Sequence, residues 1–215
     1  MPDYKAWVSD PAFIVVVSGP SGVGKSSFCQ AVLAADERVC YSVSATTRPR
    51  RGDEREGREY LFVSPAEFER MRGAGGLVEW AEVHGSWYGT PRRYLESKLR
   101  EGRIIILDVD VQGGLAIKRE FPDSVLIFIL PPSLDVLERR LRGRQSDAEE
   151  VIARRLAVAP AEIAHAVDYD YVVVNDELEA AIARVLSIVE AEKSRRERCY
   201  RPAADSRKEG GTDRA

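Results

Sequence analysis

The stretch that decides the fold is residues 13–26, FIVVVSGPSGVGKS, an apolar run followed at once by a glycine-rich octet. The octet, Gly19 to Ser26, fits the pattern G-x-x-x-x-G-K-[ST] between a predicted strand, Phe13 to Val17, and a predicted helix, Lys25 to Ala35. Glycines there let backbone N–H groups converge on phosphate oxygens, and the start of the helix adds the positive end of its dipole. Lys25 supplies a cation, and the Ser26 hydroxyl can bind Mg²⁺. The stretch therefore predicts a nucleotide-binding loop.

Apolar and amphipathic segments alternate along the rest of the chain. Four more short apolar runs are predicted strands: Val39 to Val43, Ile104 to Leu107, Val125 to Leu130 and Tyr171 to Val174. Four more helices are predicted: Pro91 to Glu101, Leu134 to Arg142, Glu149 to Ala166 and Leu178 to Arg195. Strands that are apolar throughout are typical of a parallel sheet covered by helices on both faces. We therefore predict an α/β fold with a five-stranded parallel core.

Composition and charge argue against several classes of protein. The chain has 215 residues, 44% hydrophobic and 31% charged, which is enough for a domain that folds alone. Its longest apolar runs have six residues, against roughly 20 for a bilayer span, and Met1 to Asp10 lacks the pattern of a secretory signal. The net charge of -3 argues against a nucleic-acid partner, and three cysteines without Cys-x-x-Cys spacing argue against disulfides and zinc. We expect a cytoplasmic protein with reduced thiols and no membrane partner.

One domain, 1–215, is expected, with two segments that depart from the alternating pattern. Between Ser44 and Gly89 glycine and arginine are dense, and Tyr60 to Val63 and Leu77 to Val83 are predicted strands of a separate small sheet. The stretch 139–155 is predicted to be a mobile surface flap, and 195–215 a frayed, disordered tail. The predicted divisions are a core of 12–43, 91–138 and 156–192, an inserted subdomain of 44–90 and a flap of 139–155.

Two aspartates follow the predicted strand Ile104 to Leu107. Asp108 and Asp110 lie two residues apart, so they share one face if the strand continues. Ligands of an open α/β sheet gather at this edge, where one carboxylate could hold Mg²⁺ and the other could accept a hydrogen bond from a substrate. The alternative is a turn, which aspartate also favours.

Two groups of arginines suggest a second phosphate site. The first follows the strand Val39 to Val43, and its members are Arg48, Arg50, Arg51, Arg55 and Arg58. The second contains two residues that share a helical face and one further along: Arg140, Arg144 and Arg155. Each group could also be a solvated surface. Together they suggest phosphoryl transfer between two anions, whose repulsion the guanidinium groups would offset.

The scarcity of histidine agrees with such a reaction. The chain has two histidines, His84 and His165, and we expect His165 to pack on its helix, whereas the role of His84 stays open. If the acceptor is a phosphate, its oxygen is already an anionic nucleophile, and no general base is required.

These residues together resemble the guanylate kinase family over about residues 12–192. The matching stretches are Gly19 to Ser26, Ser42 to Arg48, Gly57 to Tyr60, Val78 to Ala81, Tyr88 to Thr90, Leu107 to Gly113 and Val174 to Asp176. The resemblance implies the fold of that family, a P-loop nucleoside monophosphate kinase fold. It also implies the activity of that family, which transfers the γ-phosphate of ATP to GMP with Mg²⁺. The resemblance implies a GMP-binding subdomain over 44–90, a helical lid over 139–155, and a monomer or homodimer.

The resemblance also implies a role for each matching residue. ATP would be bound by Gly19, Pro20, Ser21, Gly22, Val23, Gly24, Lys25, Ser26 and Ser27, and Asn175 would lie near adenine. Guanine would be contacted by Ser44, Glu79, Thr90 and Asp110, and the GMP phosphate by Arg48, Arg51, Tyr60 and Tyr88. The transferring phosphate would be stabilised by Lys25, Arg48, Arg140, Arg144 and Arg155, and Mg²⁺ would be held by Ser26 and Asp108.

Guanine chemistry agrees with the implied role of Glu79. A carboxylate accepts from both N1–H and the 2-amino group, a pair that adenine lacks, although without the resemblance Glu79 fits an ordinary amphipathic strand.

The sequence departs from the family pattern at a few positions. The Pro and Gly near Arg48 lie one residue earlier than in the family, so Arg50 and Arg51 both remain candidates for the phosphate contact. Gln145 and Pro160 also depart from the expected lid and helix pattern. The alternatives are a sugar-phosphate kinase similar to ribose bisphosphate kinases and a non-catalytic interaction module of similar fold.

Overall fold

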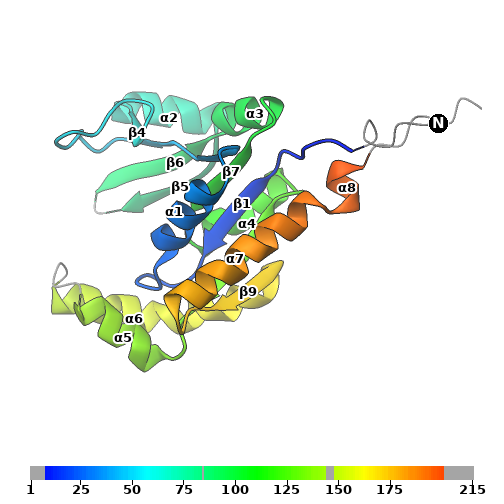
Figure 1. The fold of residues 1–215 in the computed structure, drawn as a ribbon. Coiled ribbons are helices and arrows are strands. Elements are labelled where there is room, and N and C mark those ends of the chain that lie inside the picture. Colours follow the sequence, from blue (N-terminus) through cyan, green and yellow to red (C-terminus); the bar gives the residue numbers. More distant parts are fainter. Residues whose placement is uncertain (1–7, 84, 144–147, 201–215) are drawn as a thin grey trace, which may run out of the picture.

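Figure 1 shows a molecule built on two sheets, and the computed structural model describes residues 8–83, 85–143 and 148–200. The larger sheet has five parallel strands in the order β2-β7-β1-β8-β9. These strands are β1 (Ile14–Ser18), β2 (Val39–Tyr41), β7 (Ile104–Asp108), β8 (Val125–Leu130) and β9 (Tyr171–Val174). The predicted five-stranded parallel core is confirmed.

Helices cover both faces of this sheet, because side chains alternate along each strand. Val15 and Val17 pack in one cluster with α1 and α7, whereas Ile14 and Val16 pack in another with α3 and α4. The helices are α1 (Lys25–Ala35) and α7 (Leu178–Lys193) on one face, and α3 (Arg92–Arg100) and α4 (Val111–Glu120) on the other. Within the described ranges, no helix has the length and apolar character that a membrane span requires.

The second sheet is mixed and comes from the segment predicted as an insertion. Its order is β4-β3-β6-β5, with β3 parallel to β4 and antiparallel to β6. The strands are β3 (Ser44–Thr46), β4 (Tyr60–Phe62), β5 (Leu77–Val83) and β6 (Ser86–Pro91). Helix α2 (Pro65–Gly73) covers it through Phe68, which packs on Ala45 and Leu77. The Ser64 side chain caps this helix by accepting from the Glu67 N–H at 3.1 Å.

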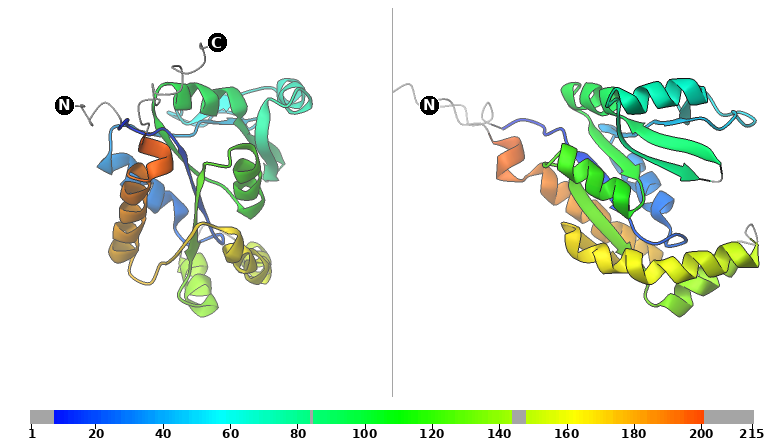
Figure 2. Two further views of the ribbon diagram at one scale, coloured as in Figure 1. Left: turned by 90° about the vertical axis from the view of Figure 1, so that its right-hand side faces the viewer. Right: turned by 180° about the vertical axis from the view of Figure 1, so that it is seen from behind.

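A helix pair occupies most of the segment predicted as a mobile flap. Helices α5 (Leu134–Gly143) and α6 (Glu149–Ala164) pack on each other through a small core that includes Leu137, Leu141 and Ile152. The expectation that 139–155 is a surface segment rather than packed core is therefore wrong for its described part, whereas its mobility stays a prediction. Helix α6 continues through Pro160 and ends in the 3₁₀ helix η2 (His165–Asp168). Figure 2 shows this pair and the second sheet projecting from the same side of the core sheet.

Two strand predictions need correction. The run Val39 to Val43 does not form one strand, because the chain leaves the core sheet after Tyr41 and enters the second sheet as β3. The strand before Asp110 does not continue either. It ends at Asp108, and Asp110 caps α4 by accepting from the Gly113 N–H at 2.8 Å. Asp108 and Asp110 therefore do not share a strand face.

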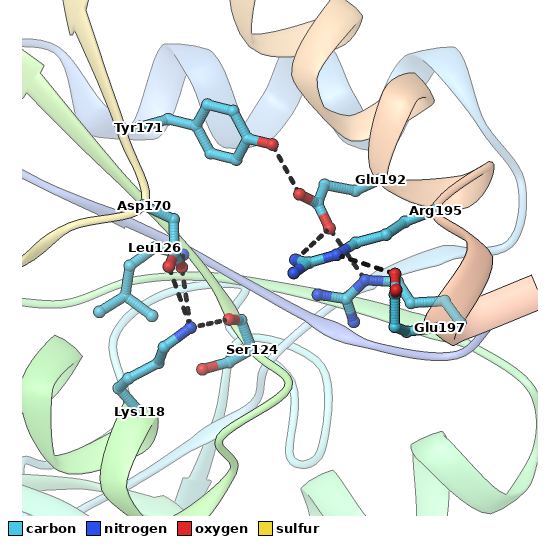
Figure 3. A network of polar contacts seen from close by, with 9 residues as sticks. Lys118, Ser124, Leu126, Asp170, Tyr171, Glu192, Arg195 and Glu197 are labelled. Carbon is cyan, nitrogen blue, oxygen red and sulfur yellow. Dashed lines mark hydrogen bonds and ion pairs between the residues drawn. The ribbon is translucent and has the colours of Figure 1, made fainter.

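Residues 196–199 form a short helix, where the sequence predicts a disordered tail. Glu192, 4% exposed, accepts hydrogen bonds from the Tyr171 hydroxyl at 2.6 Å, shown in Figure 3, and from Arg198 Nε at 2.9 Å. Arg198 belongs to the short helix α8 (Arg196–Cys199), and the Ser9 N–H donates to the Cys199 carbonyl at 2.8 Å. The tail prediction is wrong for 195–200, and 201–215 lie outside the described residues.

Candidate active site

The glycine-rich octet forms a tight loop between β1 and α1. Gly19 has a φ of 143°, and a Cβ there would lie 2.3 Å from the Ile129 carbonyl oxygen, so no other residue fits. Gly22 has a φ of 90°, and a Cβ there would lie 2.6 Å from Leu141 Cδ2 of α5. The loop therefore lies between the carboxyl end of β8 and helix α5.

Lys25 lies at the start of α1 with its side chain turned back onto this loop. Its Nζ donates to the Gly19 carbonyl at 2.7 Å and more weakly to the Pro20 carbonyl at 3.4 Å. Burial lowers the pKa of Lys25, against the opposing charges of Asp108 and Glu162. A partly desolvated ammonium group has a strong electrostatic interaction with an incoming anion.

Asp108 lies beside the loop with both carboxylate oxygens engaged. Ser26 Oγ donates to Oδ2 at 3.2 Å, and the Tyr41 hydroxyl donates to Oδ1. The structure thus brings together the two predicted metal ligands, Ser26 and Asp108. Sequence reasoning missed Tyr41, whose contact with Asp108 joins positions 67 residues apart.

A cavity of about 260 Å³ opens between the carboxyl edge of the core sheet and the second sheet. Five of the predicted acceptor-site residues line it: Ser44, Tyr60, Glu79, Tyr88 and Asp110. Tyr41 and Asp108 also line the cavity, so it shares a wall with the phosphate loop. The Tyr60 and Tyr88 rings meet edge to face, with centroids 5.9 Å apart. The cavity therefore joins aromatic faces, carboxylates and a hydroxyl next to the loop.

Glu79 is a carboxylate of this cavity whose ionisation is influenced by Thr90 and Asp110. The Thr90 hydroxyl donates to Glu79 Oε1 at 2.5 Å, and Thr90 is fully buried behind it. Burial, with the charge of Asp110 adding to it, raises the pKa of Glu79, whereas the Thr90 hydrogen bond lowers it. The Cα of Gly113 lies between the two acids, since a Cβ there would be 3.3 Å from Glu79 Oε2 and 3.4 Å from Asp110 Oδ1.

Arg48, in the first group of arginines, is held by an acidic side chain and lies against an aromatic ring. Its guanidinium binds the Glu54 carboxylate in two places, at 2.7 and 3.0 Å, and lies 5.2 Å from the centre of the Tyr60 ring. These hydrogen bonds with Glu54 raise the pKa of Arg48. By contrast, the Arg51 side chain is exposed and not part of the cavity wall, although its backbone N–H donates to Glu54 at 2.8 Å. Sequence reasoning missed Glu54, which organises this segment.

The second group of arginines is only partly described. Arg140 Nη2 in α5 donates to the backbone carbonyl of Asn175 at 3.0 Å, and Arg155 is half-buried in α6. Arg144, like His84 and Gln145, lies outside the described residues. The side-chain amide of Asn175 donates to the Val23 carbonyl in the phosphate loop at 2.8 Å. The structure thus connects Arg140, Asn175 and the loop.

Comparisons with known proteins agree with this geometry. A model of the family described as "Guanylate kinase" matches residues 12–192. This chain belongs to the guanylate kinase family. It is 47% identical to a guanylate kinase of Symbiobacterium thermophilum, across 85% of this chain and 86% of the relative. A guanylate kinase of Rhizobium meliloti is 51% identical, with coverage of 86% and 85%.

The fold likeness extends to a solved member of the family. The crystal structure of a guanylate kinase from Anaplasma phagocytophilum superposes with a TM-score of 0.70 at 36% identity. The match covers 89% of this chain and 92% of that chain. The organisation of this chain is therefore similar, over most of its length, to that of a solved guanylate kinase.

Proposed function

We propose that this chain transfers the γ-phosphate of ATP to GMP, giving ADP and GDP. The observation that carries the proposal is the placement of Glu79 and Asp110 in a cavity that Asp108 also lines. Asp108 in turn is hydrogen-bonded to Ser26 of the phosphate loop. An acceptor bound against these acids would point its phosphate toward the loop. Closure of the second sheet and of the α5–α6 pair would exclude water, which would otherwise hydrolyse ATP.

The acceptor site has the chemistry that guanine requires. Glu79 can accept from guanine N1–H and the 2-amino group while Thr90 holds its carboxylate, and Ser44 and Asp110 offer further polar contacts. Tyr60 and Tyr88 line the same cavity, and Arg48 lies over Tyr60, so these groups would bind the GMP phosphate, with exposed Arg51 reaching it on closure. Adenine offers no donor pair to Glu79, and this half-buried acid, left with its bond from Thr90 alone, would disfavour AMP.

The donor site would consist of Gly19 to Ser27, with the backbone N–H groups and Lys25 on the phosphates. Lys25, Arg48, Arg140, Arg144 and Arg155 are proposed to stabilise the charge of the transferring phosphoryl group. The attacking oxygen belongs to the GMP phosphate and is already anionic, so no side chain needs to remove a proton. Positioning and charge neutralisation would then account for most of the rate.

Ser26 and Asp108 are suitable ligands for Mg²⁺, because both present hard oxygen atoms at the mouth of the loop, 3.2 Å apart. Among the described residues there is no cluster of three or more His, Cys, Asp or Glu side chains that could form a complete metal cage. Mg²⁺ commonly keeps water and phosphate oxygens and needs only one or two protein ligands. When bound, it would neutralise charge on the phosphates of ATP.

A substrate panel tests the proposal. ATP with GMP, dGMP, AMP, CMP, UMP or a ribose bisphosphate, followed by coupled detection of ADP, should show turnover with GMP above the other ribonucleotides. Turnover only with the ribose bisphosphate would instead identify a sugar-phosphate kinase. No turnover with any acceptor, despite nucleotide binding, would identify a non-catalytic module.

Lys25→Ala gives a second test. Removal of the loop ammonium should lower kcat by about 10³-fold or more, because the transferring charge loses its nearest cation. The matched control is Lys98→Ala, which removes a lysine paired with Glu101 on α3, away from the loop, and should leave kcat unchanged. A near-normal kcat for Lys25→Ala would contradict the donor site.

A further inference from the structure

Asn175 is a buried side chain between the phosphate loop and the helix pair. It follows β9, is 3% exposed, and its backbone N–H donates to the Leu130 carbonyl at the end of β8 at 2.8 Å. Its side-chain Nδ2 donates to the Val23 carbonyl, also at 2.8 Å. Its backbone position is therefore fixed by the core sheet, and its amide nitrogen is already in use within the protein.

The hydrogen bond from Asn175 to the Val23 carbonyl also orients the N–H of the next residue, Gly24. The peptide unit between Val23 and Gly24 is planar, and no described peptide bond is cis, so the Val23 carbonyl and the Gly24 N–H point in opposite directions. Gly24 has a φ of 98°, and glycine, which lacks a Cβ, tolerates many backbone angles, so a contact from another segment can help to fix the direction of its N–H. Asn175 supplies that restraint from the side of the loop opposite to the Gly24 N–H.

The backbone of Asn175 also holds an arginine of the helix pair. Arg140 Nη2 donates to the Asn175 carbonyl at 3.0 Å, while Nη1 is buried and has no hydrogen-bond partner among the described residues. Helix α5 touches the loop independently where Leu141 closes on Gly22. One residue thus connects the loop, the end of β8 and the guanidinium group.

We propose that Asn175 is a positioning residue whose side-chain amide aims the Gly24 N–H at the donor phosphates, next to the backbone carbonyl that binds Arg140. The inference rests on the proposed function, because it takes the loop to be the donor site. It differs from recognition of adenine by this side chain, since an adenine contact would leave the phosphates unaffected. The two roles predict different behaviour toward a ligand that has phosphates and no base.

Inorganic tripolyphosphate is that ligand, and calorimetry with Mg²⁺ measures its binding. Asn175→Ala and Asn175→Leu should each weaken tripolyphosphate binding about tenfold or more, the loss of one hydrogen bond to a charged group. Asp176→Asn is the matched control, because Asp176 is exposed, can keep its bond with the Glu177 N–H, and loses a negative charge together with a long, exposed ion pair with Arg184. This control should bind tripolyphosphate at least as tightly as the wild type.

Steady-state kinetics provide the second readout. In both Asn175 variants kcat should fall about 10²-fold with ATP and in parallel with GTP and ITP as donors, while KM for GMP stays unchanged. Unchanged tripolyphosphate binding with a rise only in KM for ATP would overturn the proposal in favour of adenine recognition. If one variant does not fold, the other is read in the same way. If neither folds, Asn175→Ser, a polar replacement without the amide donor, is read in the same way.

Lys25→Ala separates this inference from the proposed function. If Lys25→Ala abolishes tripolyphosphate binding and the Asn175 variants keep it, the positioning role alone fails. If wild-type protein does not bind tripolyphosphate, the donor site itself fails, and the inference fails with it.

Discussion

Glu79 and Asp110 present two carboxylates to one cavity, an arrangement that is unfavourable without a ligand. Burial and the charge of Asp110 raise the pKa of Glu79, whereas the hydroxyl and the backbone of Thr90 stabilise its ionised form. A purine with two adjacent donors would relieve this cost by hydrogen bonding. The same desolvation that destabilises the free protein therefore favours guanine over a base without those donors.

Glu79→Gln tests this at the level of the reaction. The amide replaces one acceptor by a donor that opposes guanine, so kcat/KM for GMP should fall about 10²-fold or more, and the preference over AMP should narrow. The control is Glu82→Gln on the same strand, where the side chain is exposed. Initial rates with GMP and AMP measure both effects. Unchanged GMP kinetics in Glu79→Gln would exclude a contact with guanine.

The same variant has a predicted effect on stability. Because the pKa of Glu79 is raised in the folded state, the unfolded chain holds fewer protons between the ordinary and the raised value. The free energy of unfolding therefore falls as pH rises through that window, and the penalty is complete above it. At pH 7 Glu79→Gln should be more stable than wild type, and this advantage should vanish as pH falls toward 4.5, the ordinary pKa.

Urea unfolding at pH 7 and at pH 4.5 measures that difference, with Glu82→Gln again as the control. A destabilised Glu79→Gln at pH 7 would mean that hydrogen bonding outweighs desolvation at this carboxylate.

At the scale of elements, the sequence predicts some helices and strands with their correct ends and fails to predict others. Helix α1 and strand β5 have the predicted limits, since the glycine loop and the apolar pattern are local. Helix α4 was missed because Gly113 and Gly114 are poor helix formers. Helix α2 was also missed, although Ser64, Pro65 and Glu67 form a recognisable start.

The site shows the same division. The loop lysine and serine follow from one motif, and Asp108 follows from its position after a strand. Tyr41 and Asn175 contact Asp108 and Val23, which lie 67 and 152 positions away, and no pattern in the sequence brings these pairs together. Arg48 and Glu54, which form a two-point ion pair, are only six positions apart in the sequence. Their contact nevertheless depends on a turn that the spacing of charges alone does not specify.

Gly114 has a packing reason that can be tested. A Cβ there would lie 2.6 Å from the Tyr169 hydroxyl oxygen and 3.1 Å from Ser18 Oγ, so α4 lies too close to the Tyr169 side chain and to the end of β1 for a side chain at this position. Gly114→Ala should lower the free energy of unfolding by about 1–3 kcal/mol, despite the better helix propensity of alanine. Gly73→Ala is the matched control, because Gly73 also lies in a helix and has no atom within 4 Å of its Cβ position. Chemical denaturation of both variants measures the difference, and a stabilised Gly114→Ala would contradict the close packing.

At the scale of the whole molecule, the candidate acceptor site is divided between two parts of the fold. Glu79 comes from β5 in the second sheet, whereas Asp108 and Asp110 come from the end of β7 and the start of α4 in the core. Helix α4 of the core lies against β5, and Gly113 leaves room beside the helix for the Glu79 carboxylate. A ligand held by both sets of acids would therefore join the second sheet to the core.

GMP should consequently protect the second sheet as well as the cavity. At 100 times its Kd, GMP should raise the free energy of unfolding by about 2.7 kcal/mol and slow hydrogen exchange in β3, β5 and β6. Glu79→Gln, tested at the same GMP concentration, should lose most of this protection, and Glu82→Gln should keep it. Exchange measured by mass spectrometry resolves the two sheets separately. Protection confined to the core strands would show that the nucleotide binds without engaging β5, because only a contact across both parts can transmit binding energy to the second sheet.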